Sequence, residues 1–344
     1  MSGFVLPAAA WEVTLDGRDL TAVMDPLLSS LTIAEKRSEA CDQLDIVLND
    51  LDGKLVIPPE GALLRVRMGW ARGSGLPLGL IDMGTFKVDE AEFSGPPDQI
   101  TIRARSADFT DAFRVRRERG FVGKTVKEIV GAIAADNGLA ATIDAALGAR
   151  TIPALGHGAK SDAALLAALG RRFDAVSTVK AGTLIFAPIG KGRSAGGQTL
   201  PTVEIARQET SGQIRYARVS RNAYDGVTAV WHDKAAAKRH TVKHGGSGGG
   251  QGRGKAKRLR KVYASEADAR QAAEAESSRM SRRVATASIA LALGRPDIFP
   301  EIPVTLSGFK EEIDGRRWIV ESVRHSMDGR ERSGRIWSWK RWLS

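Results

Sequence analysis

The chain has 344 residues, 42% of them hydrophobic and 26% charged, and it carries a formal net charge of +11. This length suits two or three domains of ~100–200 residues, and the composition is ordinary for a globular protein. No apolar run approaches the ~20 residues of a membrane helix, which argues against a membrane partner, and the single cysteine, Cys41, excludes an intrachain disulfide and favours cytoplasmic folding.

Residues 1–105 have the pattern of short antiparallel strands. Apolar and polar residues alternate in segments such as WEVTL (11–15) and ALLRVRM (62–68). Asp-Gly pairs and the SGPPD stretch (94–98) separate these segments. Period-two alternation with this punctuation predicts an antiparallel sheet or barrel.

Residues 106–190 change to a helical pattern and predict a small α+β domain. Thr125 and Glu128 have the spacing of a capping box at the start of one helix, and Ser161 is the expected N-cap of a second. The stretch that follows predicts a hairpin turning at residues 181–182.

Residues 191–344 predict a second β domain with a basic, Gly-rich loop at 234–261. Strand patterns resume near residue 201, and a helix capped by Ser265 is expected at about 265–283. The segment 234–261 holds ten Lys and Arg and no acidic residue, so it accounts for ten of the eleven net charges and leaves +1 for the rest. Its glycine tract predicts a flexible hairpin loop.

This basic loop has two interpretations, which the sequence leaves open. It is either a solvated, mobile connection or an electrostatic contact with DNA, RNA or an acidic protein surface. The candidate interaction residues in it are Lys238, Arg239, Lys243, Arg253, Lys255, Lys257, Arg258 and Arg260. Further candidates are Trp337, Trp339 and Trp342, which lie either in an interface strand or simply in the last strand of the second β domain.

The two β regions share an internal repeat. The order Pro-Glu, strand, Gly-aromatic, Ile-Asp and aromatic-x-Val-acid occurs at 59–89 and again at 300–321. The spacing from Asp82 to Phe86 equals that from Asp314 to Trp318. The repeat predicts two similar β units in each chain, so that three chains arranged around an axis would present six.

No catalytic, cofactor or metal constellation emerges. The GFVGKT segment has Glu118 where a phosphate-binding loop needs Gly, and two serine-nucleophile patterns lie in expected linkers. His240 and His244 have metal-like spacing, but they lie in an expected loop with no Cys nearby. Asp42 is expected to be a surface acid and His325 a packed or surface strand residue. The sequence therefore predicts no enzyme, no cofactor and no metal.

Three segments carry a family resemblance: GTFKVDEAEFSGPPDQITIRARSADF (84–109), RKVYASEADARQAA (260–273) and LGRPDIFPEIPVTLSGFKEEIDGRRWIVESVRHSM (293–327). They resemble the phage late control protein D family, the baseplate hub proteins of contractile tails. The resemblance extends over about 11–342. This chain departs from the family pattern at LGHGAKSD (155–162) and in its basic, aromatic end WSWKRWLS (337–344).

The resemblance implies a mainly β fold with two tube-like β-barrels per chain, here 1–105 and 191–344, and the α+β domain 106–190 between them. It implies a homotrimer that forms a pseudo-six-fold ring and joins the hexameric tail tube, or a tube-initiator protein, to the trimeric central spike. Other baseplate proteins are implied partners, and a related fold occurs at the base of type VI secretion spikes.

The implied location is the tail baseplate of the virion, with assembly in the host cytoplasm. A basic loop near the bore would allow transient contact with DNA. Two alternatives stay open from the residues: a nucleic-acid-binding protein that uses 234–261, and a tail-associated peptidoglycan hydrolase.

Overall fold

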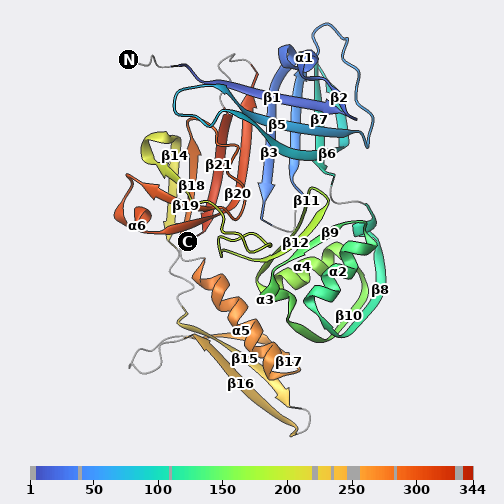
Figure 1. The fold of residues 1–344 in the computed structure, drawn as a ribbon, viewed down its shortest axis with the longest axis vertical. Helices are drawn as coiled ribbons and strands as arrows, with labels where there is room; N and C mark the ends of the chain where they lie inside the picture. Colours follow the sequence, from blue (N-terminus) through green and yellow to red (C-terminus); the bar gives the residue numbers. More distant parts are fainter. Residues whose placement is uncertain are drawn as a thin grey trace.

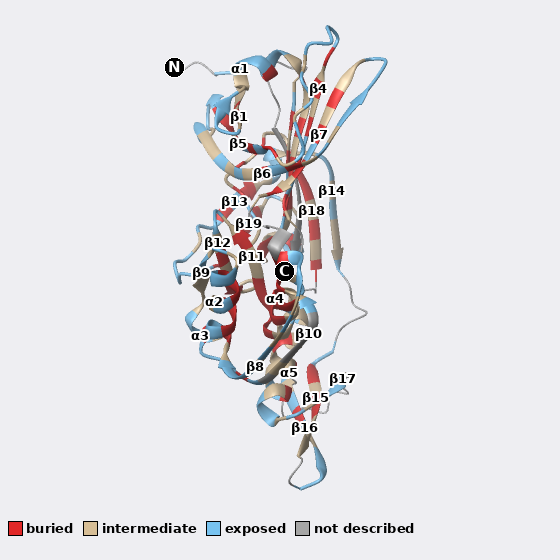
Figure 2. Ribbon diagram, turned by 90° about the vertical axis from the view of Figure 1, so that its right-hand side faces the viewer, coloured by how far each residue is buried: buried red, intermediate tan, exposed pale blue. Residues whose placement is uncertain are grey.

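The computed structural model describes residues 5–37, 41–107, 111–218, 224–233, 236–245, 256–282, 285–329 and 336–343. Figure 1 shows four parts: two β modules, an α+β module and a small sheet covered by one long helix. Each part has a hydrophobic core of its own. In Figure 2 the buried residues follow the strands of these parts. None of the described helices is long and apolar enough to cross a membrane.

The first β module confirms the period-two prediction. In β4, Leu44, Ile46 and Leu48 are buried while Asp45 is exposed, because successive side chains of a strand point to opposite faces. The spatial order of its main strands is β1-β5-β6-β7-β4-β3. Its elements are β1 (Ala8–Leu15), β2 (Arg18–Asp19), α1 (Thr21–Met24), η1 (Asp25–Leu27), β3 (Leu28–Lys36), β4 (Gln43–Asn49), β5 (Leu63–Arg72), β6 (Gly79–Ser94) and β7 (Gln99–Ser106).

The second β module repeats this topology. Its spatial order is β13-β19-β20-β21-β18-β14, so in both modules the strands run first-fourth-fifth-sixth-third-second. The one difference is that the first strand is antiparallel to the fourth in the first module and parallel to it in the second. Its elements are β13 (Val203–Ala206), η3 (Arg207–Glu209), β14 (Thr210–Arg218), β18 (Ala285–Leu291), β19 (Pro303–Ser307), α6 (Glu311–Asp314), β20 (Arg317–Asp328) and β21 (Ile336–Leu343).

The registers of the two modules also correspond. Phe86 of β6 lies opposite Leu64, as Trp318 of β20 lies opposite Val304. Both strands then shift register just after a valine, between Val88 and Glu90 and between Val320 and Ser322. This confirms the repeat at its Phe86/Trp318 end.

The Pro-Glu end of the predicted repeat is off by one residue. The backbone N–H of Gly61 donates to the Val88 carbonyl, and the N–H of Glu301 donates to that of Val320. Gly61 and Glu301 also share a left-handed backbone, with φ of 88° and 76°. Gly61 is therefore the structural counterpart of Glu301. The sequence comparison aligned Glu60 with Glu301 instead, because a non-Gly residue seldom adopts this conformation and a Gly–Glu correspondence is not expected.

The α+β module confirms the predicted helices and hairpin. The capping box of Thr125 and Glu128 is formed, Ser161 caps the second helix, and the turn at Ala181 and Gly182 has positive φ at both residues. Its elements are η2 (Asp111–Arg114), β8 (Arg116–Thr125), α2 (Val126–Asp136), β9 (Ala140–Ile143), α3 (Ala145–Gly148), β10 (Thr151–Ser161), α4 (Asp162–Phe173), β11 (Ala175–Lys180) and β12 (Thr183–Pro188).

Half of the predicted basic loop 234–261, its residues 238–245 and 256–261, forms strands of a sheet. A three-stranded sheet, here called the basic sheet, has the order β16-β15-β17 and is inserted between β14 and β18. Helix α5, capped by Ser265 as predicted, packs on one of its faces. The bounds are β15 (Gly226–Asp233), β16 (Lys238–Gly245), β17 (Ala256–Tyr263) and α5 (Glu266–Ser281). The many charged residues and glycines of the segment obscured the alternation of inward and outward residues along β16, which places Val242 on the buried face.

The two β modules are joined in one sheet. Strand β3 of the first module pairs antiparallel with β20 of the second, so the described strands of both modules belong to a single 13-stranded sheet. A second contact between the modules is a hydrogen bond in which the buried indole N–H of Trp70 donates to the Gly294 carbonyl at 3.0 Å.

Replacing Trp70 by Phe should therefore destabilise the protein by about 1–3 kcal/mol, because the buried Gly294 carbonyl loses its donor. Chemical denaturation followed by circular dichroism measures the change. Trp11→Phe is the matched control: Trp11 bonds to Asp25, which is exposed and can be hydrated instead, so its loss should be smaller. Equal losses would contradict a special role for the Trp70 bond.

Candidate assembly interface

The seam between β3 and β20, here called the β3–β20 seam, is well packed. In its register Ile33 lies opposite His325 and Leu31 opposite Met327. Leu31, Ile33 and His325 are fully buried, and Val323 and Met327 nearly so. The seam thus buries a continuous apolar face around one histidine.

A charged cluster, here called the seam cluster, lies at one end of the seam. Lys180, the last residue of β11, donates to Glu35 of β3 at 3.2 Å and forms an ion pair with Asp42. The His325 Nε2 atom is 3.7 Å from a Glu35 oxygen and 3.2 Å from the Ile298 carbonyl. The cluster therefore links both β modules and the α+β module.

Burial and charge compete within the seam cluster. Burial alone would raise the pKa of Glu35, but its contacts with His325 and Lys180 outweigh burial and lower the pKa. Burial likewise disfavours the ammonium of Lys180, yet Glu35 and Asp42 raise its pKa. For Asp42 burial prevails, and its pKa is raised. Lys180 is thus the cation that keeps two buried carboxylates in place.

Further ionic contacts surround the cluster. Arg37 pairs with Glu301, which also accepts a hydrogen bond from the Gly190 N–H at 2.7 Å. At the other side of the α+β module, Arg172 of α4 is 2.5 Å from Asp268 of α5. A cleft of about 660 Å³ separates the parts near Lys180. The α+β module is therefore held through charged contacts around a cleft.

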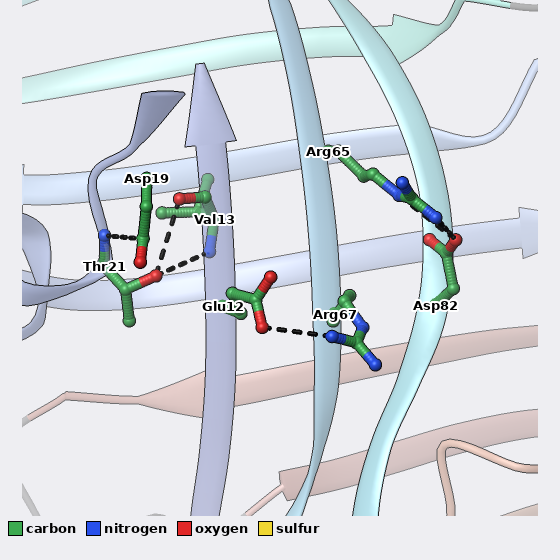
Figure 3. Close-up of polar contacts among 7 residues, drawn as sticks. All are labelled: Glu12, Val13, Asp19, Thr21, Arg65, Arg67 and Asp82. Carbon is green, nitrogen blue, oxygen red and sulfur yellow. Dashed lines mark hydrogen bonds and ion pairs between the residues drawn. The ribbon is translucent and has the colours of Figure 1, made fainter. Parts of the chain in front are cut away.

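Paired charges line the exposed face of the first β module. Figure 3 shows Glu12 of β1 with Arg67 of β5 at 3.1 Å, and Arg65 of β5 with Asp82 of β6 at 2.5 Å. The hydrogen bond from Arg65 lowers the pKa of Asp82. Such exposed pairs add little stability.

Within the two β modules, the outer edge of β14 and the second half of β6 have no strand neighbour among the described residues. β14 pairs with β18 on one edge only. The second half of β6, from Glu90 to Ser94, pairs with β7, while β5 pairs with β6 only as far as Lys87. The aromatic ring of Phe93 is 52% exposed there. Open edges of this kind are sites where another chain can add a strand.

The basic residues singled out from the sequence are divided by the basic sheet. Arg239 and Lys243 alternate with His240 and Val242, so they lie on the face away from α5, and Arg258 lies opposite Thr228 on that same face. Lys257 instead turns to α5 and is 2.5 Å from Glu276. Lys238 and Arg260 are exposed at other positions of these strands. Arg253 and Lys255 lie outside the described residues.

The C-terminal tryptophans lie on a strand with neighbours on both edges. Strand β21, which carries Trp337, Trp339 and Trp342, pairs with β18 and with β20. Its backbone edges are therefore used within the chain. His240 stacks on Trp231 with ring centroids 4.9 Å apart, and no group of metal-binding side chains occurs within the described parts of the chain.

Sequence reasoning missed the seam cluster. Asp42 was expected at the surface but is only 7% exposed, and Glu35 is equally buried. The one sequence signal was Glu35 at an inward position of the strand pattern of β3, where an apolar residue is normal. Lys180 gives no such signal, because it lies some 140 residues away in another module.

The chain matches the family model described as phage tail baseplate hub (GPD) over residues 65–330. It is 36% identical to a probable baseplate hub protein of Escherichia phage 186, over 93% of this chain and 90% of the relative. The 43 kDa tail protein of prophage MuSo2 from Shewanella oneidensis has the same fold, with a TM-score of 0.68, 14% identity and 98% of both chains covered.

A component of the Escherichia coli type VI secretion system also shares the fold. The TM-score is 0.54 at 11% identity, and the match covers 92% of this chain and 73% of the other. The mainly β architecture expected from the sequence, with an α+β part in its middle, is thereby confirmed.

We expect Lys180→Met to destabilise the protein by about 3 kcal/mol at neutral pH. This is the lower end of the cost of breaking a buried ion pair, and we choose it because the Lys180 side chain is still 37% exposed. Without Lys180, burial should raise the pKa of Glu35 and Asp42. Protonation of these two groups at acid pH would then remove the cost of burying unpaired carboxylates. The difference in unfolding free energy between the variant and the wild type should therefore become smaller towards about pH 4.

Urea unfolding at a series of pH values tests this expectation. Lys54→Met is the control, because Lys54 forms an exposed pair with Asp52 and its loss should leave the unfolding free energy almost unchanged. A gap for Lys180→Met that stays constant with pH would contradict the assigned role of the two carboxylates.

Proposed function

This chain belongs to the phage tail baseplate hub family, and we propose that three copies form a pseudo-six-fold ring that joins the hexameric tail tube to the trimeric central spike. The observation that carries the proposal is the shared strand order and register shift of the two β modules. Two near-equivalent modules per chain give six around a three-fold axis. Such a ring can contact a six-fold partner on one side and a three-fold partner on the other.

The proposed role is mechanical attachment, and we infer no catalytic activity. The buried carboxylates of the seam cluster, Glu35 and Asp42, pair with Lys180, and these contacts hold the modules together. The proposed partners are a second and third copy of the chain, the tail tube or its initiator, the spike and other baseplate proteins. The proposed site of action is the baseplate of the virion tail, after assembly in the host cytoplasm.

The outward face of the basic sheet favours contact with a polyanion as a secondary role. Arg239, Lys243 and Arg258 project from it on the side away from α5. Three such cations attract phosphate at moderate ionic strength. Within the hub this contact would be transient, with DNA moving past the ring.

The ring predicts a defined mass. Native mass spectrometry of the purified chain, alone and mixed with its spike partner, should find a species of three 36.9 kDa chains. Mixing with the spike should raise the trimer fraction, because binding to an assembled ring stabilises it by mass action. A stable dimer or tetramer in the spike complex would overturn the proposed symmetry.

The polyanion contact predicts weak, salt-sensitive DNA binding. Changing Arg239, Lys243 and Arg258 together to Gln should make the fall of log K with log salt less steep. The magnitude of the slope should decrease by up to about 2.7, at ~0.9 per phosphate contact. A control variant with Arg18, Lys54 and Arg72 changed to Gln removes three exposed charges elsewhere and should keep the slope. Tight binding at physiological salt that the first variant abolishes would favour the nucleic-acid-binding alternative.

A further inference from the structure

The chain fills one strand edge of its second β module and leaves the corresponding edge of its first module open. On β20, residues Ser322 to Asp328 follow the register shift and are covered by β3. On β6, residues Glu90 to Ser94 follow the same shift, and their edge has no strand neighbour within the described chain. Counting from the shift makes Phe93 the counterpart of His325.

The exposures of these two residues differ sharply. His325 is 0% exposed beneath β3, whereas Phe93 is 52% exposed. The buried face of β20 continues through Met327, which is 5% exposed. A large aromatic side chain therefore lies uncovered at the position where the other module has a fully packed residue. Among the described residues, no strand takes the place in the first β module that β3 takes in the second.

The chain also carries a strand equivalent to β3, namely β14, whose other edge pairs with no described strand. β14 is the second strand of its module and pairs with the third, β18, as β3 pairs with β4. In the second module, Tyr216 lies opposite Ala287, and Ala287 lies opposite the backbone of Trp342. In the first module, Ile33 lies opposite Leu44, and Leu44 lies opposite Ala104. Tyr216 is thus the counterpart of Ile33, the residue that faces His325.

A chain does not reach its own open edge with its own β14. In the joined sheet, β14 and β6 are seven strands apart, in the order β14-β18-β21-β20-β3-β4-β7-β6. In Figure 1, β14 lies at the left of the two β modules and β6 at the right, and no described residue of β14 pairs with β6. The counterpart relation therefore selects β14 of a second copy as the strand that covers β6.

The side chains that would meet are complementary. Transferring the β3–β20 register places Tyr216 opposite Phe93, Ala217 opposite Glu92 and Arg215 opposite Ser94. The first is an aromatic cross-strand pair on the core face. On the outer face Arg215 is diagonal to Glu92, whose neighbour Glu90 shares Arg103 with it. The contact therefore buries an exposed aromatic ring and brings a cation to an acidic pair.

We propose that β14 of one copy pairs antiparallel with Glu90–Ser94 of β6 in the next copy, with Tyr216 opposite Phe93. The contact repeats between molecules the join that the β3–β20 seam makes within one. Because it is head-to-tail and each join advances by one module, six modules close a ring after three chains. The inference rests on the proposed hub ring and assigns the residues that close it.

The test uses disulfide trapping in the full-length chain. In a Cys41→Ser background, Glu92→Cys and Ala217→Cys introduce thiols at directly opposed positions on the outer face. Oxidation of the purified chain at high concentration, alone and with the spike partner, should give covalent dimers and trimers and nothing larger on a denaturing gel. The matched control pairs Glu92→Cys with Arg218→Cys, whose side chain points to the opposite face of β14, and should not cross-link.

Each outcome has a consequence. Trimers by native mass without covalent species overturn this seam and leave the hub ring standing. Monomers without covalent species overturn both. A ladder of covalent species beyond three supports the seam but overturns closure at three chains, and with it the proposed ring. Cross-linking of the control pair as efficient as that of the test pair would show that the register is wrong.

A second variant probes the seam without engineered thiols. Phe93→Glu places a charge opposite Tyr216 and near Glu92. Since Phe93 is already half exposed in the single chain, its unfolding midpoint should stay near that of the wild type. The trimer fraction should fall at least tenfold. Phe299→Glu, at an exposed aromatic (40%) in the second module, is the control and should leave the trimer fraction unchanged.

Discussion

The backbone pairing of β3 with β20 is the constraint on which the rest of the structure depends. A strand edge exposes unpaired N–H and C=O groups, so each β module with an open edge offers a site where another strand can pair. Joining them through β3 satisfies one pair of edges and fixes the direction and register of one module relative to the other. Because the two modules have the same strand order, the geometry of this one join defines a rotation from module to module.

The seam cluster fixes that register. A slip of one residue would turn every side chain of β3 to the other face of the sheet. Glu35 would then turn to solvent, and Lys180 and His325 would both lose their contact with it. Buried ion pairs of this kind add little net stability compared with apolar packing, because desolvation offsets their attraction. Their value here is specificity: they permit one register of β3 and tie the α+β module to it.

The sequence predicted the features that depend on neighbouring residues. Thr125, Ser161 and Ser265 cap helices through contacts within four residues, and the alternation of β4 depends only on which face is buried. The basic sheet was missed because ten cations and a glycine tract resemble a mobile loop in composition, whereas Val242 alternating with outward cations makes a strand under α5. The sequence thus predicted the positive charge of this segment correctly, but not its conformation.

The seam was beyond sequence reasoning for a different reason. It joins residues almost 300 positions apart, such as Ile33 and His325, and neither segment carries a local signal for its partner. The internal repeat came close to it: the likeness of Phe86 and Trp318 is real. However, the Pro-Glu match misplaced Gly61 and Glu301, because a shared left-handed backbone leaves no common residue type when one copy uses glycine. The two modules are more alike in strand order than in residue identity.

The differences between the two modules are as informative as their likeness. Strand order, register shift and the hydrogen bonds of Gly61 and Glu301 are common to both, so in the proposed ring they would recur six times. The basic sheet and α5 interrupt only the second module, between β14 and β18, where the first has the short β3–β4 connection. The α+β module and the reversed first strand also occur once per chain. Each would recur three times, so the shared framework suits a six-fold neighbour and the unshared parts suit a three-fold one. Two identical modules would present six-fold symmetry on both sides of the proposed ring, so the differences between them are what would let one chain contact both kinds of partner.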